Sequence, residues 1–265
     1  MLVEFHQLAA AIYLAAGIGA LVGVVLPDPR MSRGASFGLV IGAAVQTVAF
    51  ATLHRVESPP ITSLPLVLAS SAWMTVVFAV LLSFRVRLPG LAAVVGPLAF
   101  LTVFVASIYW SPRAGLAIEA NPTGTWPHIH VLLASAGIAL LGIAGLAGLF
   151  FLLEHRRLKA KPPLPATISL PSLEALDRVN VVTTAVGFAL LTLGILTGMI
   201  WLNEAQGMAW MGTPHEAWMV ISWAIYAGLV AARYAGRQGA RQAAASALAG
   251  FAFLLFGVVG VGVMS

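Results

Sequence analysis

The feature that most constrains this chain is a series of long apolar stretches that carry no charge. A helix rises about 1.5 Å per residue, so about 20 apolar residues cross a bilayer core of roughly 30 Å. Eight stretches of about this length occur, at 5–26, 35–53, 64–84, 88–110, 130–153, 179–201, 217–232 and 243–264. We therefore predict an all-α, polytopic membrane protein with eight transmembrane helices, forming a single domain over residues 1–265.

The composition excludes other classes of protein. Of the 265 residues, 60% are hydrophobic and only 9% are charged, whereas soluble domains carry roughly 25% charged residues. A soluble enzyme or a nucleic-acid-binding module would need polar surface that this chain lacks. Glu4 and His6, rather than cations, precede the first apolar stretch, which is longer than the core of a signal peptide, so we expect that stretch to be retained.

The positions of Lys and Arg predict the orientation in the membrane. Of the 14 cations, 12 lie around Arg30 and Arg33, around Arg85 and Arg87, in 156–178 and in 233–241, while Arg55 and Arg113 lie on the other side. By the positive-inside rule, those four loops are cytoplasmic and both termini are outside. Topology thus explains the net charge of +5 without nucleic acid. The loop 154–178 divides two four-helix halves, and within it Ser172 is expected to cap a helix.

The histidines gather on one side of the predicted membrane protein. His6, His54, His128, His130 and His215 lie at the outer boundary, and only His155 lies inside. For any one of these histidines, the plainer explanation is that polar side chains prefer helix ends, where they reach water. The chain has no cysteine. Thiolate metal sites and covalent haem attachment are therefore excluded, and a metal must bind His, Met or carboxylate.

Large aromatic side chains accompany the outer histidines. Trp110, Trp126, Trp201 and Trp210 lie at or beyond the outer span ends. Such belts are common at membrane interfaces, but imidazoles that can ligate iron, together with flat rings that can pack on a porphyrin, also fit a haem site. His128 and His130 point about 200° apart on a helix, so at most one faces a given cavity. We favour His130, because small residues follow it.

Polar and small residues inside the spans predict how the helices pack. Most of the Ser and Thr side chains can bond to the carbonyl four residues back, whereas Gln46 needs a partner from another helix. Glycines are frequent in 137–148 and in 187–198. We expect these two runs to allow close helix packing.

The second half of the chain carries a family resemblance. The segments Leu191-Thr-Leu-Gly-Ile-Leu-Thr-Gly198, Trp201-Leu-Asn-Glu-Ala-Gln-Gly-Met-Ala-Trp210 and Thr213-Pro-His-Glu-Ala-Trp218 resemble the cytochrome c assembly family of CcsA, ResC and CcmC. Trp126-Pro-His-Ile-His-Val131 resembles the helix that precedes this loop in the family. The resemblance is best over residues 125–262, and 63–73 is its best early patch.

The resemblance implies a haem site at the outer face. In that family, a tryptophan-rich outer loop flanked by histidines holds haem, and His130 matches the first of those histidines. Of the loop signature, Trp210, Pro214, Glu216 and Trp218 remain, while Gln206, Gly212 and Thr213 replace the usual Trp, Trp and Asp; Gln46 and Ala231 stand where intraspan histidines are expected. In these respects the chain is closer to the reduced HemX-like and YpjD-like branch, in which a histidine opens span seven, as His215 does here.

The resemblance and the histidine pattern together define an expected site. The expected cofactor is haem b, with His130 and His215 as axial ligands. A pairing that involves His6 or His54, and the absence of haem, stay open, and His128 is a further candidate. The residues expected to contact the cofactor are Trp126, Trp201, Trp210, Glu216 and Trp218. The expected partners are haem, the lipid bilayer and a membrane protein of cytochrome c maturation or respiration, in the bacterial cytoplasmic membrane.

Three functions are compatible with such a site. The first is handling of haem at the outer membrane face for cytochrome c maturation, without independent catalysis. The second is electron transfer as a cytochrome b-like subunit of a respiratory complex, and the third is a non-catalytic, HemX-like assembly or regulatory subunit with a vestigial haem site. A transporter is disfavoured, because no pair of broken helices with intramembrane ions is evident.

Overall fold

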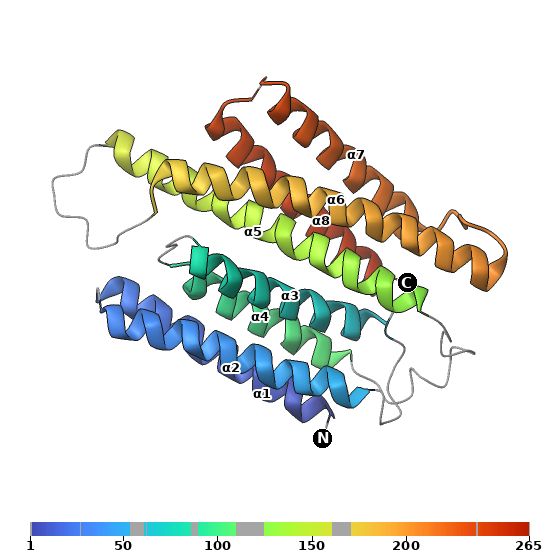
Figure 1. The fold of residues 1–265 in the computed structure, drawn as a ribbon, viewed down its shortest axis with the longest axis horizontal. Helices are drawn as coiled ribbons and strands as arrows, with labels where there is room; N and C mark the ends of the chain where they lie inside the picture. Colours follow the sequence, from blue (N-terminus) through green and yellow to red (C-terminus); the bar gives the residue numbers. More distant parts are fainter. Residues whose placement is uncertain are drawn as a thin grey trace. The chain divides into compact units, whose positions relative to one another are not determined.

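A computed structural model describes residues 2–26, 28–53, 61, 63–85, 90–109, 125–160, 171–236 and 238–264. These residues form eight helices: α1 (Leu2–Val25), α2 (Pro29–Leu53), α3 (Leu64–Arg85), α4 (Leu91–Ile108), α5 (Trp126–Ala160), α6 (Leu173–Gln206), α7 (Pro214–Tyr234) and α8 (Ala240–Met264) (Figure 1). All eight are long and apolar enough to cross a membrane. The predicted fold class is confirmed, whereas the orientation of the termini stays a prediction.

The chain divides into two compact units. The first comprises Met1–Thr123 with Leu164–Pro171 and contains α1 to α4; the second comprises Gly124–Pro163 with Ser172–Ser265 and contains α5 to α8. The two four-helix units part near residue 123, between α4 and α5. The predicted divider, the loop 154–178, lies instead between α5 and α6, so it follows five helices and does not coincide with this boundary. The prediction of a single domain over residues 1–265 stays a prediction.

A buried polar contact joins three helices of the first unit. Helix α1 packs against α2 and α4, and α3 packs against α4 and α2. Gln46 on α2 is fully buried. Its carboxamide oxygen accepts from the Tyr13 hydroxyl of α1 at 2.8 Å, and its nitrogen donates to the Ala69 carbonyl of α3 at 3.0 Å. The expectation that Gln46 needs a partner from another helix is confirmed.

Helix α5 is the centre of the second unit. It packs against α6 and α8, and α7 packs against α8 and α6. Small residues permit the close approaches: a Cβ on Gly137 would lie 2.8 Å from the backbone nitrogen of Leu191, and one on Gly148 would collide with the Ala244 carbonyl. The predicted close packing of the two glycine runs is confirmed where Gly137 meets α6. Most of the apolar length of α5 is buried.

Helices α5 and α6 extend beyond the predicted apolar spans. Helix α5 continues through Ala160, and α6 begins at Leu173, so both enter the predicted loop 154–178. The Ser172 hydroxyl accepts from the backbone N–H of Ala175 at 3.2 Å, which confirms the predicted cap. The polar turns remain helical because their backbone hydrogen bonds do not depend on side-chain hydropathy.

Candidate functional site

His130 lies in the second turn of α5, where α5 packs against α6. Its Nδ1 atom is 2.8 Å from the carbonyl oxygen of Gly194, and the side chain is half-buried. A carbonyl only accepts hydrogen bonds, so Nδ1 carries the proton and donates it. In the neutral imidazole, Nε2 then keeps its lone pair and is available as a ligand.

Two residues of α6 shape the surroundings of this imidazole. A Cβ on Gly198 would lie 2.8 Å from His130 Nδ1, so the absence of a side chain there makes room for the ring. Trp201, one turn further along α6, stacks on the His130 ring with the centroids 6.2 Å apart and an interplanar angle of 27°. Together, the glycine and the tryptophan fix where the imidazole lies and how it is turned.

His215 lies in the first turn of α7, which is held by a capping box. The Thr213 side chain accepts from the N–H of Glu216 at 3.3 Å, and the Glu216 carboxylate accepts from the N–H of Thr213 at 3.0 Å. The same carboxylate accepts from the N–H of Met211 at 3.1 Å. Pro214 occupies the first turn, where it has no N–H to leave unpaired. The carboxylate therefore orders the connection that precedes His215.

The two predicted axial ligands lie at the same end of the second unit. His130 contacts Trp201 near the C-terminal end of α6, and His215 lies in the first turn of the next helix. His215 is exposed, while His130 is half-buried against α6. Trp218, one turn after His215, stacks on Phe253 of α8 with the centroids 4.5 Å apart. His130 is thus in contact with the Trp201 indole of α6, and Trp218 of α7 packs against α8.

The other expected site residues lie in several places. Trp126 opens α5 and is half-buried, Trp210 is exposed between α6 and α7, and His128 is half-buried on α5. His6 lies in the first unit, buried against Phe50 at 5.1 Å between ring centroids. His54 and Trp110 lie outside the described residues. His155, at the opposite end of α5 from His130, stacks on Phe151.

The two histidines suit a haem iron better than a metal ion that is bound by protein side chains alone. Among the described residues, no three His, Asp or Glu side chains converge as they would around a metal ion, and the sequence has no cysteine. A haem iron needs only one or two protein ligands, because the porphyrin supplies four nitrogens. Two imidazoles, one with Nδ1 already bonded to a carbonyl, suit that requirement.

Two features of the second unit were missed by reasoning from sequence. One is the Gly194 carbonyl as the partner of His130; the glycines at 194 and 198 were interpreted only as packing residues. The other is an ion pair between Arg233 and Asp177 on different helices. The positions of these two charges, at the ends of neighbouring spans, were the available signal.

Comparison with known proteins identifies relatives of the chain. Residues 6–265 match the sequence model of a family described as "Cytochrome C assembly protein". A cytochrome c biogenesis protein CcsA from Guillardia theta is 25% identical over 244 residues, covering 85% of this chain and 81% of that protein. The CcsA protein of Prochlorococcus marinus (strain MIT 9303) is 36% identical over 99 residues, and that match covers 37% of this chain and only 31% of that protein. The CcsA protein of Nostoc punctiforme is 35% identical over 105 residues.

Proposed function

Since this chain belongs to the cytochrome c assembly protein family and is a multi-pass membrane protein, we propose that it binds haem b and handles it for cytochrome c maturation. The observation that carries this proposal is the His130 imidazole, whose Nδ1 is fixed by the Gly194 carbonyl beside Trp201. His130 and His215 are the proposed axial ligands.

The residues around the two imidazoles have separate proposed tasks. Gly194 and Gly198 hold the His130 ring in one orientation and one tautomer, which raises the basicity of the liganding nitrogen. Trp201 and Trp218 offer flat apolar surface for a macrocycle. Trp126 and Trp210 lie close in sequence to the same helix ends and have the same proposed task. Glu216 is engaged by backbone N–H groups, so its proposed task is to position His215.

Bound haem would supply a redox-active iron centre, which His130 and His215 would hold. Coordination by two imidazoles would favour carrying haem or electrons over oxygen chemistry. Without cysteine the chain cannot hold the haem through thioether bonds, so the proposed haem b would be bound without covalent attachment and could be released. Release is what a protein that hands haem to an assembling cytochrome requires.

The proposal includes a side of the membrane and a branch of the family. The basic residues at the other end of α5, α6 and α7 support, by the positive-inside rule, a position of His130 and His215 on the outer side. The segment 206–218, which includes the loop between α6 and α7, keeps Trp210, Glu216 and Trp218 but has Gln206, Gly212 and Thr213 at other signature positions. This reduction favours the HemX-like and YpjD-like branch.

The reduced loop also supports a second candidate, a HemX-like assembly or regulatory subunit whose haem site is vestigial. The two candidates differ in whether the histidines are needed. If the site is vestigial, variants at His130 and His215 retain the cellular role, which would then depend on a partner protein. If the protein handles haem, variants at His130 and His215 lose the cellular role.

An absorption spectrum of the purified protein tests the proposal. We expect a Soret band and a b-type pyridine haemochrome that are lost in His130→Ala and in His215→Ala, because each removes one axial ligand. His155→Ala is the matched control, since His155 lies on the same helix at the opposite end and should leave the spectrum unchanged. A wild-type protein without haem, or a spectrum that both ligand variants retain, would disprove the site.

A further inference from the structure

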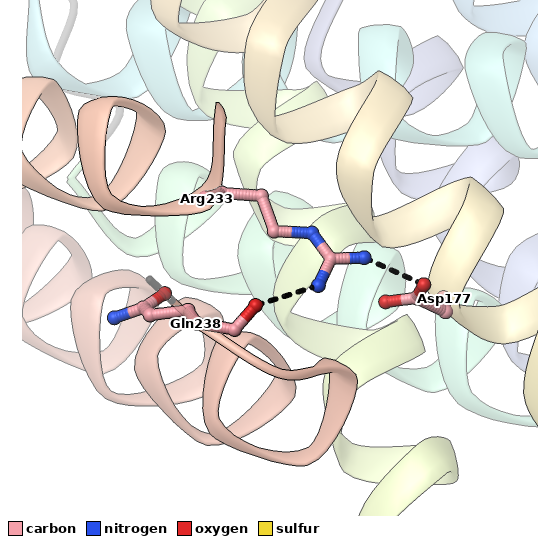
Figure 2. A network of polar contacts seen from close by, with 3 residues as sticks. All are labelled: Asp177, Arg233 and Gln238. Atoms are coloured by element: carbon pink, nitrogen blue, oxygen red, sulfur yellow. Dashed lines mark hydrogen bonds and ion pairs between the residues drawn. The ribbon is translucent and has the colours of Figure 1, made fainter. Parts of the chain in front are cut away.

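An arginine at the end of α7 is held rigidly by two acceptors. One terminal nitrogen of Arg233 donates to the Asp177 carboxylate of α6 at 2.6 Å, and the other donates to the Gln238 carbonyl at 3.1 Å (Figure 2). Both charged side chains are about three-quarters buried, with 23% and 26% exposed. A guanidinium has five N–H donors in a fixed plane. These two bonds therefore leave three donors on a group whose orientation is already set.

The guanidinium borders a cleft between α6, α7 and α8. The cleft is shallow and open, and the space within it that a water-sized sphere can enter is about 20 Å³. Most of its lining is apolar and includes Val181, Ala185, Leu229, Val230, Ala243 and Ala247. The polar residues of the lining are Asn180, Thr184, Arg233, Gln238 and Ser246. An apolar groove and one cation therefore lie next to each other.

The cleft lies at the depth where a membrane headgroup would be. Arg233 is in the last turn of α7, a helix long and apolar enough to cross a membrane. Arg178, Arg241, Arg156 and Arg157 lie at the corresponding ends of α6, α8 and α5. At the other ends of these helices, the described segments 125–131 and 200–216 contain no Lys or Arg. The field at the mouth of the cleft thus favours an anion.

We propose that this cleft binds an anionic phospholipid, with the phosphate on the free donors of Arg233 and an acyl chain along the apolar wall. A ligand with an anionic head and an apolar tail matches both the guanidinium and the apolar lining beside it. Asp177 is the positioning residue: it orients the guanidinium without using its remaining donors. The proposal concerns the opposite helix ends from the histidines and does not depend on haem binding.

The test uses the full-length protein in a neutral detergent and measures its thermal unfolding as lipid is added. We expect phosphatidylglycerol to raise the unfolding midpoint of the wild-type protein in a saturable way, and phosphatidylcholine to have little effect. Arg233→Gln should weaken the apparent affinity roughly tenfold, as expected for the loss of a hydrogen bond to a charged group. Arg178→Gln is the matched control, because it removes an exposed cation at the same end of the unit.

Two further variants keep the test valid if Arg233→Gln alone misfolds. Arg233→Gln alone leaves the Asp177 carboxylate without its cation, so the double variant Asp177→Asn/Arg233→Gln removes both charges together. Ala185→Phe fills the apolar wall and keeps the arginine. We expect both to fold and to lose the response to phosphatidylglycerol. An equal response to phosphatidylcholine or to inorganic phosphate, or a full response of the double variant, would overturn the proposal.

Discussion

At the scale of single residues, one missing side chain controls the proposed axial ligand. His130 reaches the Gly194 carbonyl only because position 198 on α6 has no Cβ. This hydrogen bond fixes both the tautomer and the rotation of the ring. Histidines that ligate metals commonly donate their second nitrogen to a carbonyl or carboxylate, and loss of that partner lowers affinity about 10- to 100-fold.

Gly198→Ala should therefore weaken haem binding while both ligands remain in the chain. The new methyl group would lie 2.8 Å from Nδ1, so the ring must move away from the Gly194 carbonyl. We expect a loss of haem affinity of about tenfold or more, measured by titrating haem into the purified protein depleted of haem.

Gly228→Ala is the control for this substitution. It is also a helical glycine of the second unit, but a Cβ there meets no atom within 4 Å. Its haem affinity should equal that of the wild-type protein. Equal affinities for all three proteins would show that the contact between α5 and α6 does not position His130 for binding.

At the scale of helices, Gln46 shows how a single polar residue fixes the packing of the first unit. The side chain joins α2 to the Tyr13 hydroxyl of α1 and to the Ala69 carbonyl of α3. Tyr13 is fully buried, so its hydroxyl cannot turn to water if Gln46 is lost. Buried polar groups without a partner are costly, although the cost measured between membrane helices is moderate.

Gln46→Leu should lower the free energy of unfolding by about 1 to 2 kcal/mol. The measurement is an unfolding titration in mixed micelles. The double variant Tyr13→Phe/Gln46→Leu removes both polar groups, so it should be more stable than Gln46→Leu alone. If the single and double variants unfold at the same point, the pair does not hold the helices together.

The helices themselves were predictable from sequence, but their ends were not. A run of about 20 apolar residues identifies a span because the bilayer thickness sets its length. This rule cannot detect polar turns that stay helical. It therefore missed the first turns of α2, which contain Arg30 and Arg33, and the last turn of α5. The capping box of Thr213 and Glu216 was a readable signal for the start of α7.

The candidate site was predictable only in outline. Alternating spans bring the N-terminal end of α5 and that of α7 to one side, which placed His130 with His215. The partner of His130 depends on the axial register between α5 and α6. Side-chain packing, rather than composition, determines that register. The contact between Asp177 and Arg233, 56 residues apart, depends on the same kind of packing.

At the scale of the whole molecule, the proposed function depends on which side of the membrane the histidine end faces. Haem handed to a cytochrome outside the cell membrane must be held on that side. The chain makes this easy to test because it has no cysteine, so each introduced cysteine is the only thiol. Glu204 at the C-terminal end of α6 and Arg178 near its start are both exposed and lie at opposite ends of one span.

We expect a membrane-impermeant maleimide to label Glu204→Cys in intact cells and to label Arg178→Cys only after the membrane is opened. The cations that gather near the start of α6 are held inside during insertion, which gives this direction. Labelling of both variants in detergent is the control for thiol access. The reverse pattern would put His130 and His215 on the cytoplasmic side, where the same residues would fit haem uptake or regulation rather than delivery to cytochromes outside.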